Sequence, residues 1–110
     1  MRQQEIWLAD LNPTAGSEQS GIRPVVIVSG NAMNDHFRLC IVCPLSSKIK
    51  NYAGGIVLEK TTSNGLTQDS EVLTFQIRTL SKSRLLKRIG QITNDDFQKI
   101  KTGLNDILTF

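Results

Sequence analysis

Pro24-Val25-Val26-Ile27-Val28-Ser29 is the stretch of this chain that most directly indicates its fold. A short run of β-branched apolar residues is typical of a strand that is buried on both faces. It is also the longest mostly apolar run in the sequence, and it is far shorter than the roughly 20 residues that a membrane-spanning helix needs. We therefore predict a central strand over Pro24–Ser29 and no membrane span.

Further strands are predicted on both sides of this run. One precedes it and four follow it, and polar or glycine-containing segments separate them. They cover Glu5–Leu11, Arg38–Leu45, Gly55–Glu59, Glu71–Leu80 and Arg88–Ile92.

The C-terminal segment follows a different pattern, because its apolar residues are spaced as on one face of a helix. These residues are Phe97, Ile100, Leu104, Ile107 and Leu108. Thr93 with Asp96 three residues later resembles a capping box in which aspartate holds the third position. We predict a helix from Asn94 to about Leu108, slightly weakened by Gly103.

The order of these signals, strands first and helix last, indicates the fold class. It favours an antiparallel sheet or small barrel with a helix packed on it over alternating βαβ units. With 110 residues, 39% of them hydrophobic and 21% charged, residues 1–110 fit one soluble globular domain. Acidic residues interrupt the apolar positions near the N-terminus, so we predict no signal peptide and expect a cytoplasmic protein. The formal net charge of +3 suits a polyanionic partner without requiring one.

Cys40 and Cys43 form a C-x-x-C pair inside the predicted strand Arg38–Leu45. Three residues of strand span roughly 10 Å, and these two side chains would point to opposite faces. A disulfide needs Cα atoms within about 7 Å of each other. A zinc site would need a second pair of ligands, and the only histidine is His36. We predict two ordinary free thiols.

Residues 12–23 join the first two predicted strands. This connection is unusually long, because hairpin loops usually have two to five residues. Long ordered loops often carry function. Arg23 ends this loop directly before Pro24, which restricts its predecessor to extended backbone. A guanidinium held in this way presents a planar, charged donor fork to a phosphate. A surface arginine whose stem covers apolar side chains is the simpler interpretation.

Ser46 and Ser47 place two hydroxyl groups beside Lys48 at the end of a predicted strand. Such a group of donors suits a phosphate. A serine turn that bonds its own backbone has the same sequence pattern, and both interpretations stay open.

Gln76 and Arg78 lie inside the predicted strand Glu71–Leu80. Strand alternation would place them on one face, with Phe75 and Ile77 on the other. An amide and a guanidinium on one face suit contacts to bases or phosphates, although a solvated sheet face looks the same.

Taken in order, these segments resemble the MazF/PemK family of type II toxin–antitoxin ribonucleases. The resemblance begins at Glu5–Thr14 and is most specific in Gly16-Ser17-Glu18-Gln19 with Gly21-x-Arg23-Pro24-Val25-Val26. It continues through Pro44-Leu45-Ser46-Ser47, Asp69-Ser70 and Gln76-Ile77-Arg78-Thr79, and so covers nearly the whole chain.

The resemblance implies a mainly β (α+β) fold, a small SH3-like antiparallel β-barrel of the MazF/PemK/CcdB type with a C-terminal α-helix. It implies an mRNA interferase, an endoribonuclease that cleaves single-stranded RNA at specific sequences without a metal or other cofactor. The implied partners are an antitoxin, whose extended tail occupies the RNA groove, and a second copy of the chain in a homodimer.

By position, Arg23 and Ser46 match the catalytic residues of the family, and Ser47 is the neighbouring alternative. Some members carry a histidine where this chain has Ser17, so a histidine base is excluded there. The residues assigned to RNA binding are Ser17, Glu18, Gln19, Ser47, Gln76 and Arg78.

Metal-free RNA cleavage uses the 2′-hydroxyl of the substrate as nucleophile and leaves a 2′,3′-cyclic phosphate and a 5′-hydroxyl. It needs a proton acceptor, a proton donor and positive charge. Arg23 supplies charge but is a poor base, so we assign it to stabilising the phosphorane, with transfer of a proton as a second role that stays open. Ser46 is assigned to positioning the 2′-hydroxyl or a phosphate oxygen. The general base stays open, since His36, the only side chain that ordinarily titrates near neutral pH, is expected at a loop tip.

Two other functions fit the same sequence. One is a toxin of the same fold that inhibits a DNA topoisomerase by binding, and the other is an RNA-binding barrel in which Arg23 and Arg78 only hold phosphate. The basic segment Lys82–Arg88 suits contacts to an RNA backbone or the guarding of a sheet edge. The carboxylates are scattered, so we predict no metal site.

Overall fold

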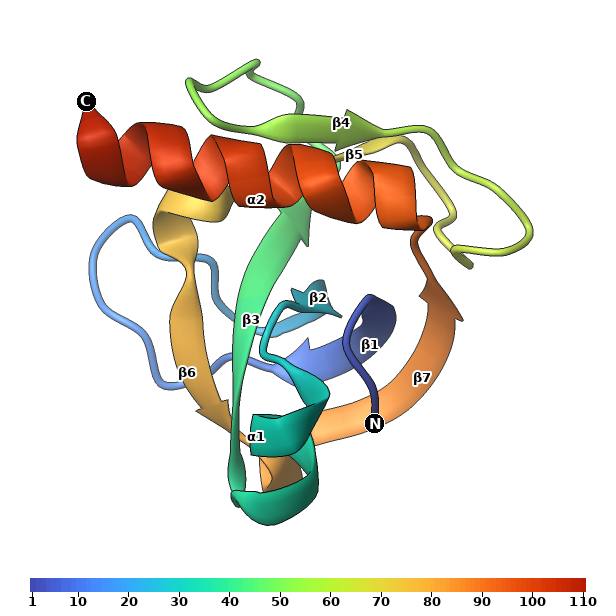
Figure 1. Ribbon diagram of the computed structural model, residues 1–110. Helices are drawn as coiled ribbons and strands as arrows, with labels where there is room; N and C mark the ends of the chain where they lie inside the picture. The colour runs from blue at the N-terminus through green and yellow to red at the C-terminus, as the bar shows by residue number, and fades with distance from the viewer.

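A computed structural model describes residues 1–110, and Figure 1 shows a strongly curved sheet with one long helix lying across it. The elements are β1 (Glu5–Asp10), β2 (Ile22–Ile27), α1 (Asn31–His36), β3 (Leu39–Ser46), β4 (Ile56–Leu58), β5 (Ser70–Val72), the 3₁₀ turn η1 (Thr74–Gln76), β6 (Arg78–Ser81), the 3₁₀ turn η2 (Lys82–Arg84), β7 (Leu85–Gln91) and α2 (Asn94–Thr109). Neither α1 nor α2 has the length and hydropathy that a membrane span requires.

All strand pairs of the sheet are antiparallel, and β3 organises them. The sheet order is β4-β5-β3-β2-β1-β7, and β6 pairs with the first half of β3. The second half of β3 pairs with β5, so the long strand passes from one part of the sheet to another. The sheet curls into a barrel-like shape without closing, with β4 and β7 at its ends. The predicted mainly β fold with a C-terminal helix is confirmed.

The β-branched run is buried on both faces, as predicted. Val26 belongs to a cluster that packs against α2, whereas Val25 and Ile27 belong to a second cluster on the opposite face. Cys43 and Cys40 of β3 are divided between these clusters in the same way, and both are buried free thiols. The prediction of two ordinary thiols is therefore confirmed.

Helix α2 begins and ends close to the predicted residues. The Thr93 Oγ1 accepts a hydrogen bond from the Asp96 backbone N–H at 3.1 Å, so the predicted cap is present. Phe97 and Ile100 are buried in the first cluster, and Gly103 packs against the loop before β4. Figure 1 shows α2 crossing in front of β3 with β4 above it.

The predicted strand Glu71–Leu80 is wrong, because η1 interrupts it and leaves two strands, β5 and β6. The backbone turns after Leu73, whose N–H donates to the Pro44 carbonyl at 2.9 Å. The Thr74 hydroxyl then donates to the Gly54 carbonyl at 2.8 Å. Since the strand is interrupted here, the predicted alternation of Gln76 and Arg78 against Phe75 and Ile77 is also wrong.

The loop tip predicted around His36 is also wrong, because Asn31–His36 form helix α1. Asn34 is its buried residue, and it accepts a hydrogen bond from the Ser29 hydroxyl at 2.6 Å and donates to the Ser29 carbonyl at 2.9 Å. Strand β2 begins and ends two residues earlier than predicted, at Ile22 and Ile27, and β7 is longer than predicted because it begins at Leu85.

Candidate active site

Arg23 lies within β2, where it pairs with Ala9 of β1. Its side chain is exposed, and its Nε donates to the Ser20 carbonyl at 3.1 Å. The loop before it is closed at its base, because the Gly21 N–H donates to the Asn12 Oδ1 at 3.1 Å and the Gly21 carbonyl accepts from the Leu11 N–H at 3.0 Å. The guanidinium therefore rests against an anchored loop end.

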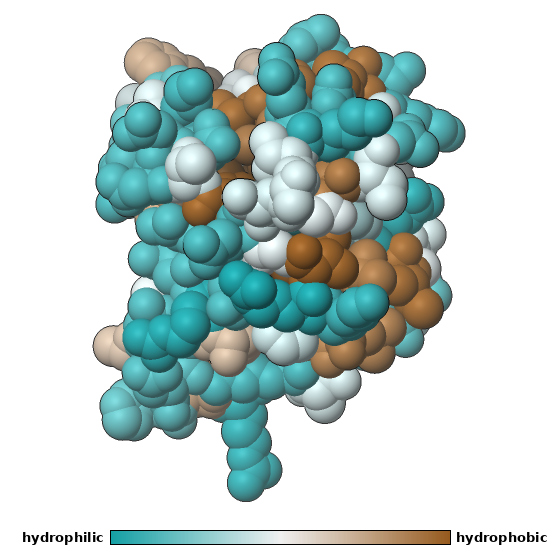
Figure 2. Space-filling view, turned by 90° about the vertical axis from the view of Figure 1, so that its right-hand side faces the viewer, coloured by the Kyte–Doolittle hydropathy of each residue, from teal (hydrophilic) through white to brown (hydrophobic).

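A pocket of about 250 Å³ adjoins Arg23, and we call it the Arg23 pocket. Leu8, Leu45 and Ile89 are among its apolar walls, and Ser47 contributes a hydroxyl. Figure 2 views the side of the molecule that carries β7, where apolar side chains reach the surface between polar ones. The pocket thus combines one cation with apolar walls and hydroxyl-bearing side chains.

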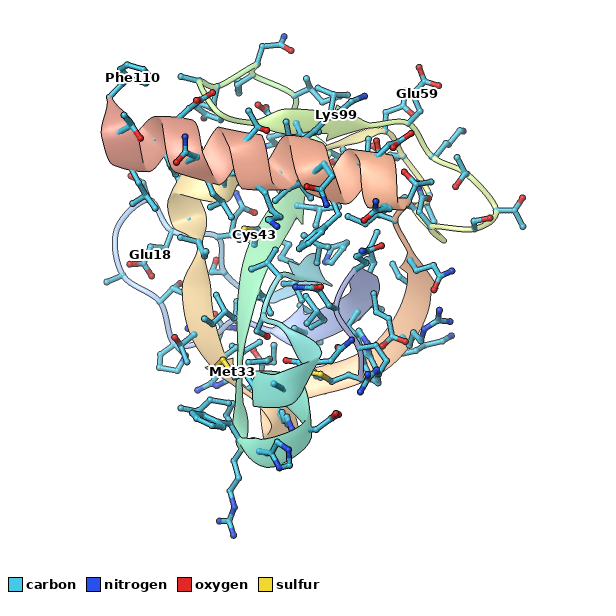
Figure 3. The ribbon with its side chains drawn as sticks, viewed as in Figure 1. Glu18, Met33, Cys43, Glu59, Lys99 and Phe110 are labelled. Carbon is cyan, nitrogen blue, oxygen red and sulfur yellow. The ribbon has the colours of Figure 1, made fainter.

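A second pocket, of about 360 Å³, lies between the β1–β2 loop and η1, and we call it the Gln19 pocket. The Gln19 N–H donates to the Gln76 Oε1 at 2.8 Å, and the Arg78 Nη1 donates to the Leu11 carbonyl at 3.3 Å. Figure 3 shows Glu18 on the same loop, beside η1 and β6. The lining residues are Leu11, Glu18, Gln19, Pro44, Phe75, Gln76, Ile77 and Arg78.

Ser46 is the last residue of β3, and Ser47 follows it. The Ser46 Oγ accepts a hydrogen bond from the Lys48 N–H at 3.2 Å, and Ser47 lines the Arg23 pocket. The β2–β3 pairing ends at Val25 opposite Pro44, and the last two residues of β3 pair with β5 instead, where Ser46 lies opposite Glu71. Ser46 lines neither pocket, but by strand alternation it shares the face of Pro44, which lines the Gln19 pocket.

The structure thus brings four of the assigned RNA-binding residues, Glu18, Gln19, Gln76 and Arg78, into one pocket. Ser17 is exposed on the loop and lines neither pocket. His36 is exposed at the end of α1 and also lies outside both. No group of three or more His, Cys, Asp or Glu side chains is arranged to hold a metal ion.

Two polar residues of the Arg23 pocket, Thr67 and Gln68, were not predicted. They belong to the β4–β5 connection, which has neither periodicity nor a recognisable motif. This connection is recognised as part of the site only in the structure, where Thr67 and Gln68 line the same pocket as Arg23 and Pro24 of β2.

The basic segment Lys82–Arg88 is largely engaged with the protein itself. The Arg84 Nη1 donates to the Asp10 carbonyl at 3.3 Å, and the Arg88 Nε lies 3.0 Å from the Glu5 Oε2. The segment covers η2 and the start of β7, which is an end strand of the sheet. Guarding of a sheet edge, one of the two interpretations of the sequence, accounts for its position.

Comparison with known proteins identifies the family. A family model described as "PemK-like, MazF-like toxin of type II toxin-antitoxin system" matches residues 2–108. This chain belongs to the PemK/MazF toxin family. A curated member, the endoribonuclease MazF of Staphylococcus saprophyticus, is 34% identical over 107 residues, which are 96% of this chain and 88% of that protein.

Solved structures of PemK/MazF toxins share the fold. MazF from Deinococcus radiodurans superposes with a TM-score of 0.86 at 24% identity, covering 100% of this chain and 97% of that one. A MazF chain from a MazE–MazF structure of the same organism has a TM-score of 0.79 at 26% identity, covering 98% and 95%. The PemK/MazF resemblance predicted from the sequence is confirmed.

Proposed function

We propose that this chain is the toxin of a type II toxin–antitoxin system and cleaves single-stranded mRNA as a metal-independent, sequence-specific endoribonuclease. One observation carries the proposal: the family match spans residues 2–108 and therefore includes both pockets and every element that forms them. The curated relative is named an endoribonuclease, which favours RNA cleavage over topoisomerase inhibition.

In the proposed reaction the 2′-hydroxyl of the substrate attacks the adjacent phosphorus. The 2′-hydroxyl loses its proton to a general base, and the 5′-oxygen gains a proton from a general acid as its bond to phosphorus breaks. The products are a 2′,3′-cyclic phosphate and a 5′-hydroxyl. Arg23, exposed on β2, stabilises the extra negative charge of the phosphorane with its donor fork. Ser46 orients the 2′-hydroxyl or a phosphate oxygen, and Ser47 is the alternative hydroxyl. The general base is not assigned.

Substrate binding is assigned to the Gln19 pocket and the residues around it. Gln19 and Gln76 offer amide groups to base edges, Arg78 offers a cation to a phosphate, and Glu18 accepts hydrogen bonds from base amino groups. Ser17 and Ser47 extend this surface on the loop and at the end of β3. The hydrogen bond that the Gln19 backbone N–H donates to the Gln76 Oε1 fixes the pocket before RNA arrives.

The proposed partners follow from the family. An antitoxin tail would occupy the RNA groove, in line with solved relatives described as an endoribonuclease with its cognate antitoxin and as MazE–MazF. We also propose that two copies of the chain form a homodimer with RNA bound near their interface. The place of action would be the cytoplasm, where mRNA is available.

The test is cleavage of a labelled random-sequence RNA by the purified protein in EDTA. We expect cleavage that leaves 2′,3′-cyclic phosphate ends, and Arg23→Ala should lower kcat at least about 100-fold, the usual cost of removing a transition-state donor. Absence of cleavage by the unmodified protein would refute the enzyme. Cleavage that survives Arg23→Ala would refute the role of Arg23, and cleavage abolished by EDTA would refute the metal-free mechanism.

Two further variants separate the hydroxyl groups. Ser46→Ala should lower kcat, whereas Ser47→Ala should leave kcat within about threefold and raise KM instead. The reverse result would transfer the catalytic role to Ser47. RNA binding without cleavage in every condition would support the non-catalytic barrel.

A further inference from the structure

Tyr52 and Phe75 form an exposed aromatic pair at the edge of the Gln19 pocket. Their ring centroids lie 4.8 Å apart at an interplanar angle of 63°, and each residue is 44% exposed. Phe75 lines the pocket itself, and Tyr52 comes from the loop between β3 and β4. Edge-on packing supports one ring while leaving aromatic surface accessible to solvent.

The loop that carries Tyr52 is fixed by a buried carboxylate. Glu71 is fully buried, and its Oε1 accepts hydrogen bonds from the N–H groups of Lys50 at 2.8 Å and Asn51 at 3.1 Å. Its Oε2 accepts a third from the Tyr52 N–H at 2.7 Å. Gly55 packs on this carboxylate so closely that an added Cβ would lie 2.3 Å from the Oε2. Glu71 therefore sets the backbone position of Tyr52.

Phe75 is held from the other side by the turn η1. The Gln76 N–H donates to the Leu73 carbonyl at 3.0 Å, and the Ile77 N–H donates to the Thr74 carbonyl at 3.1 Å. The ring is thus mounted on a hydrogen-bonded turn rather than on a free loop. Rings fixed in this way lose little conformational entropy when a flat ligand stacks on them.

The surroundings of the pair match a nucleobase. Gln76, the residue after Phe75, uses its Oε1 for the Gln19 N–H, which leaves its amide nitrogen to donate to a base edge. Arg78 of the same pocket supplies positive charge for the neighbouring phosphate. Single-stranded RNA is recognised by this combination of aromatic stacking, amide contacts and a basic groove.

We propose that Tyr52 and Phe75 form a base-stacking subsite that helps to set which nucleotide is accepted next to the cleavage site. Phe75 contacts the base directly, and Tyr52 supports its ring. Glu71 is a positioning residue that acts through the backbone of Tyr52. This inference rests on the proposed ribonuclease function and adds a specificity determinant to it.

The test first maps the cleavage site with the unmodified protein and then uses a short RNA blocked by a 2′-O-methyl group at that site. Phe75→Leu should weaken binding of this RNA about tenfold, because a stacked base contributes on the order of 1–3 kcal/mol. Phe75→Tyr keeps the ring and should bind within about twofold of the unmodified protein. Phe37→Leu, the same change at a phenylalanine that is 57% exposed beyond α1, is the matched control.

A scan of abasic nucleotides identifies the stacked base. At one position the abasic RNA should bind the unmodified protein about tenfold more weakly, and Phe75→Leu should show no further loss with it. Such non-additivity is expected only if ring and base contact each other. Unchanged binding by Phe75→Leu, or additive losses at every position, would overturn the proposal. Weakened binding of an antitoxin peptide with unchanged RNA binding would assign the pair to the antitoxin instead.

Tyr52 is the only tyrosine in the chain, so a label on tyrosine reports on this subsite alone. With 3-fluorotyrosine incorporated, RNA binding should shift its ¹⁹F resonance, and the abasic RNA should not. Glu71→Gln should reduce this shift and raise KM about as much as Phe75→Leu, with kcat retained. Loss of thermal stability alone would mean a merely structural role for Glu71. If the unmodified protein neither binds nor cleaves RNA, the ribonuclease function itself has failed, and this subsite fails with it.

Discussion

Glu5 is a carboxylate whose charge the fold stabilises. Burial raises the pKa of Glu5, but hydrogen bonds from the Trp7 indole, the Arg2 backbone and the Arg88 guanidinium outweigh it and leave the pKa below its usual value. A lowered folded-state pKa adds stability at neutral pH, and this stability is lost as the pH falls through that pKa. Glu5→Gln should therefore lower the free energy of unfolding by roughly 1–2 kcal/mol at pH 7.

Urea unfolding at pH 7 and pH 3 checks this expectation. The difference between Glu5→Gln and the unmodified protein should shrink at the lower pH, because Glu5 takes up a proton as the pH falls and then, like glutamine, carries no charge. Glu59→Gln, at an exposed carboxylate, is the control and should change stability by less than about 0.5 kcal/mol. An equal difference at both pH values would contradict the assigned role of the charge.

The two thiols should be inert in the folded protein. Burial raises the pKa of Cys43 to about 12, and burial also raises the pKa of Cys40 despite the opposing charge of Lys82. Since only the thiolate reacts, a disulfide reagent at pH 8 should modify neither cysteine until denaturant is added, and then both. Rapid modification of either thiol in native buffer would contradict this prediction and reopen the redox interpretation of the C-x-x-C spacing.

Single residues were predictable from sequence only where a local rule acts. Arg23 is extended because Pro24 follows it, and Cys40 and Cys43 face opposite ways because strand geometry requires it. The pocket partner of Gln19 was not predictable by such a rule. Gln76 is 57 positions away in the chain, and no local pattern contains that pairing.

At the scale of elements, Gly103 of helix α2 is a position where close packing and helix propensity predict opposite effects of a substitution. An added Cβ at Gly103 would lie 2.1 Å from the Gly54 carbonyl oxygen, so the buried glycine allows α2 to approach the loop before β4. Helix propensity alone would make Gly103→Ala stabilising by about 1 kcal/mol. Because the clash is with backbone, we expect a destabilisation of about 1–3 kcal/mol instead.

Thermal and urea unfolding decide between the two signs. Thr102→Ala, at the exposed neighbouring position of the same helix, is the matched control and should be neutral or slightly stabilising. Stabilisation by Gly103→Ala would show that α2 does not pack on Gly54 as described.

Elements differ in how far their sequence determines them. Helix α2 was predictable because Phe97 and Ile100 lie on a repeating apolar face and Thr93 caps its start. The turn η1 was not predictable, because the Thr74 hydroxyl donates a hydrogen bond to the Gly54 carbonyl, which is 20 residues away in the sequence. Helix α1 was missed because it is short and its one buried residue is the polar Asn34.

At the scale of the whole molecule, the candidate site forms where strands meet connections that are distant in the sequence. The Gln19 pocket joins the β1–β2 loop to η1, and the Arg23 pocket joins β2 to the β4–β5 connection. Periodicity predicts strands and helices, but it carries no information on which loops meet. The family resemblance supplied the residues of the site, and the fold supplied their grouping.

The distribution of charge predicts how salt acts on RNA binding. The net charge is +3, but Arg23 and Arg78 lie at the two pockets, whereas Arg38 and Lys87 are exposed elsewhere. Each phosphate contact on a single strand adds about 0.7 to the slope of log affinity against log salt concentration. The double variant Arg23→Gln/Arg78→Gln should therefore lower the magnitude of the slope by about 1.4.

Arg38→Gln/Lys87→Gln removes the same amount of charge and is the matched control. If net charge alone attracts RNA, the two double variants should lose affinity and slope equally. If the contacts lie at the pockets, the control should keep nearly the full slope, measured by fluorescence anisotropy between 50 mM and about 300 mM salt with the 2′-O-methyl-blocked RNA. Equal losses of affinity and slope in the two double variants would mean that Arg23 and Arg78 attract RNA only through net charge. The RNA groove would then not lie at β2 and η1.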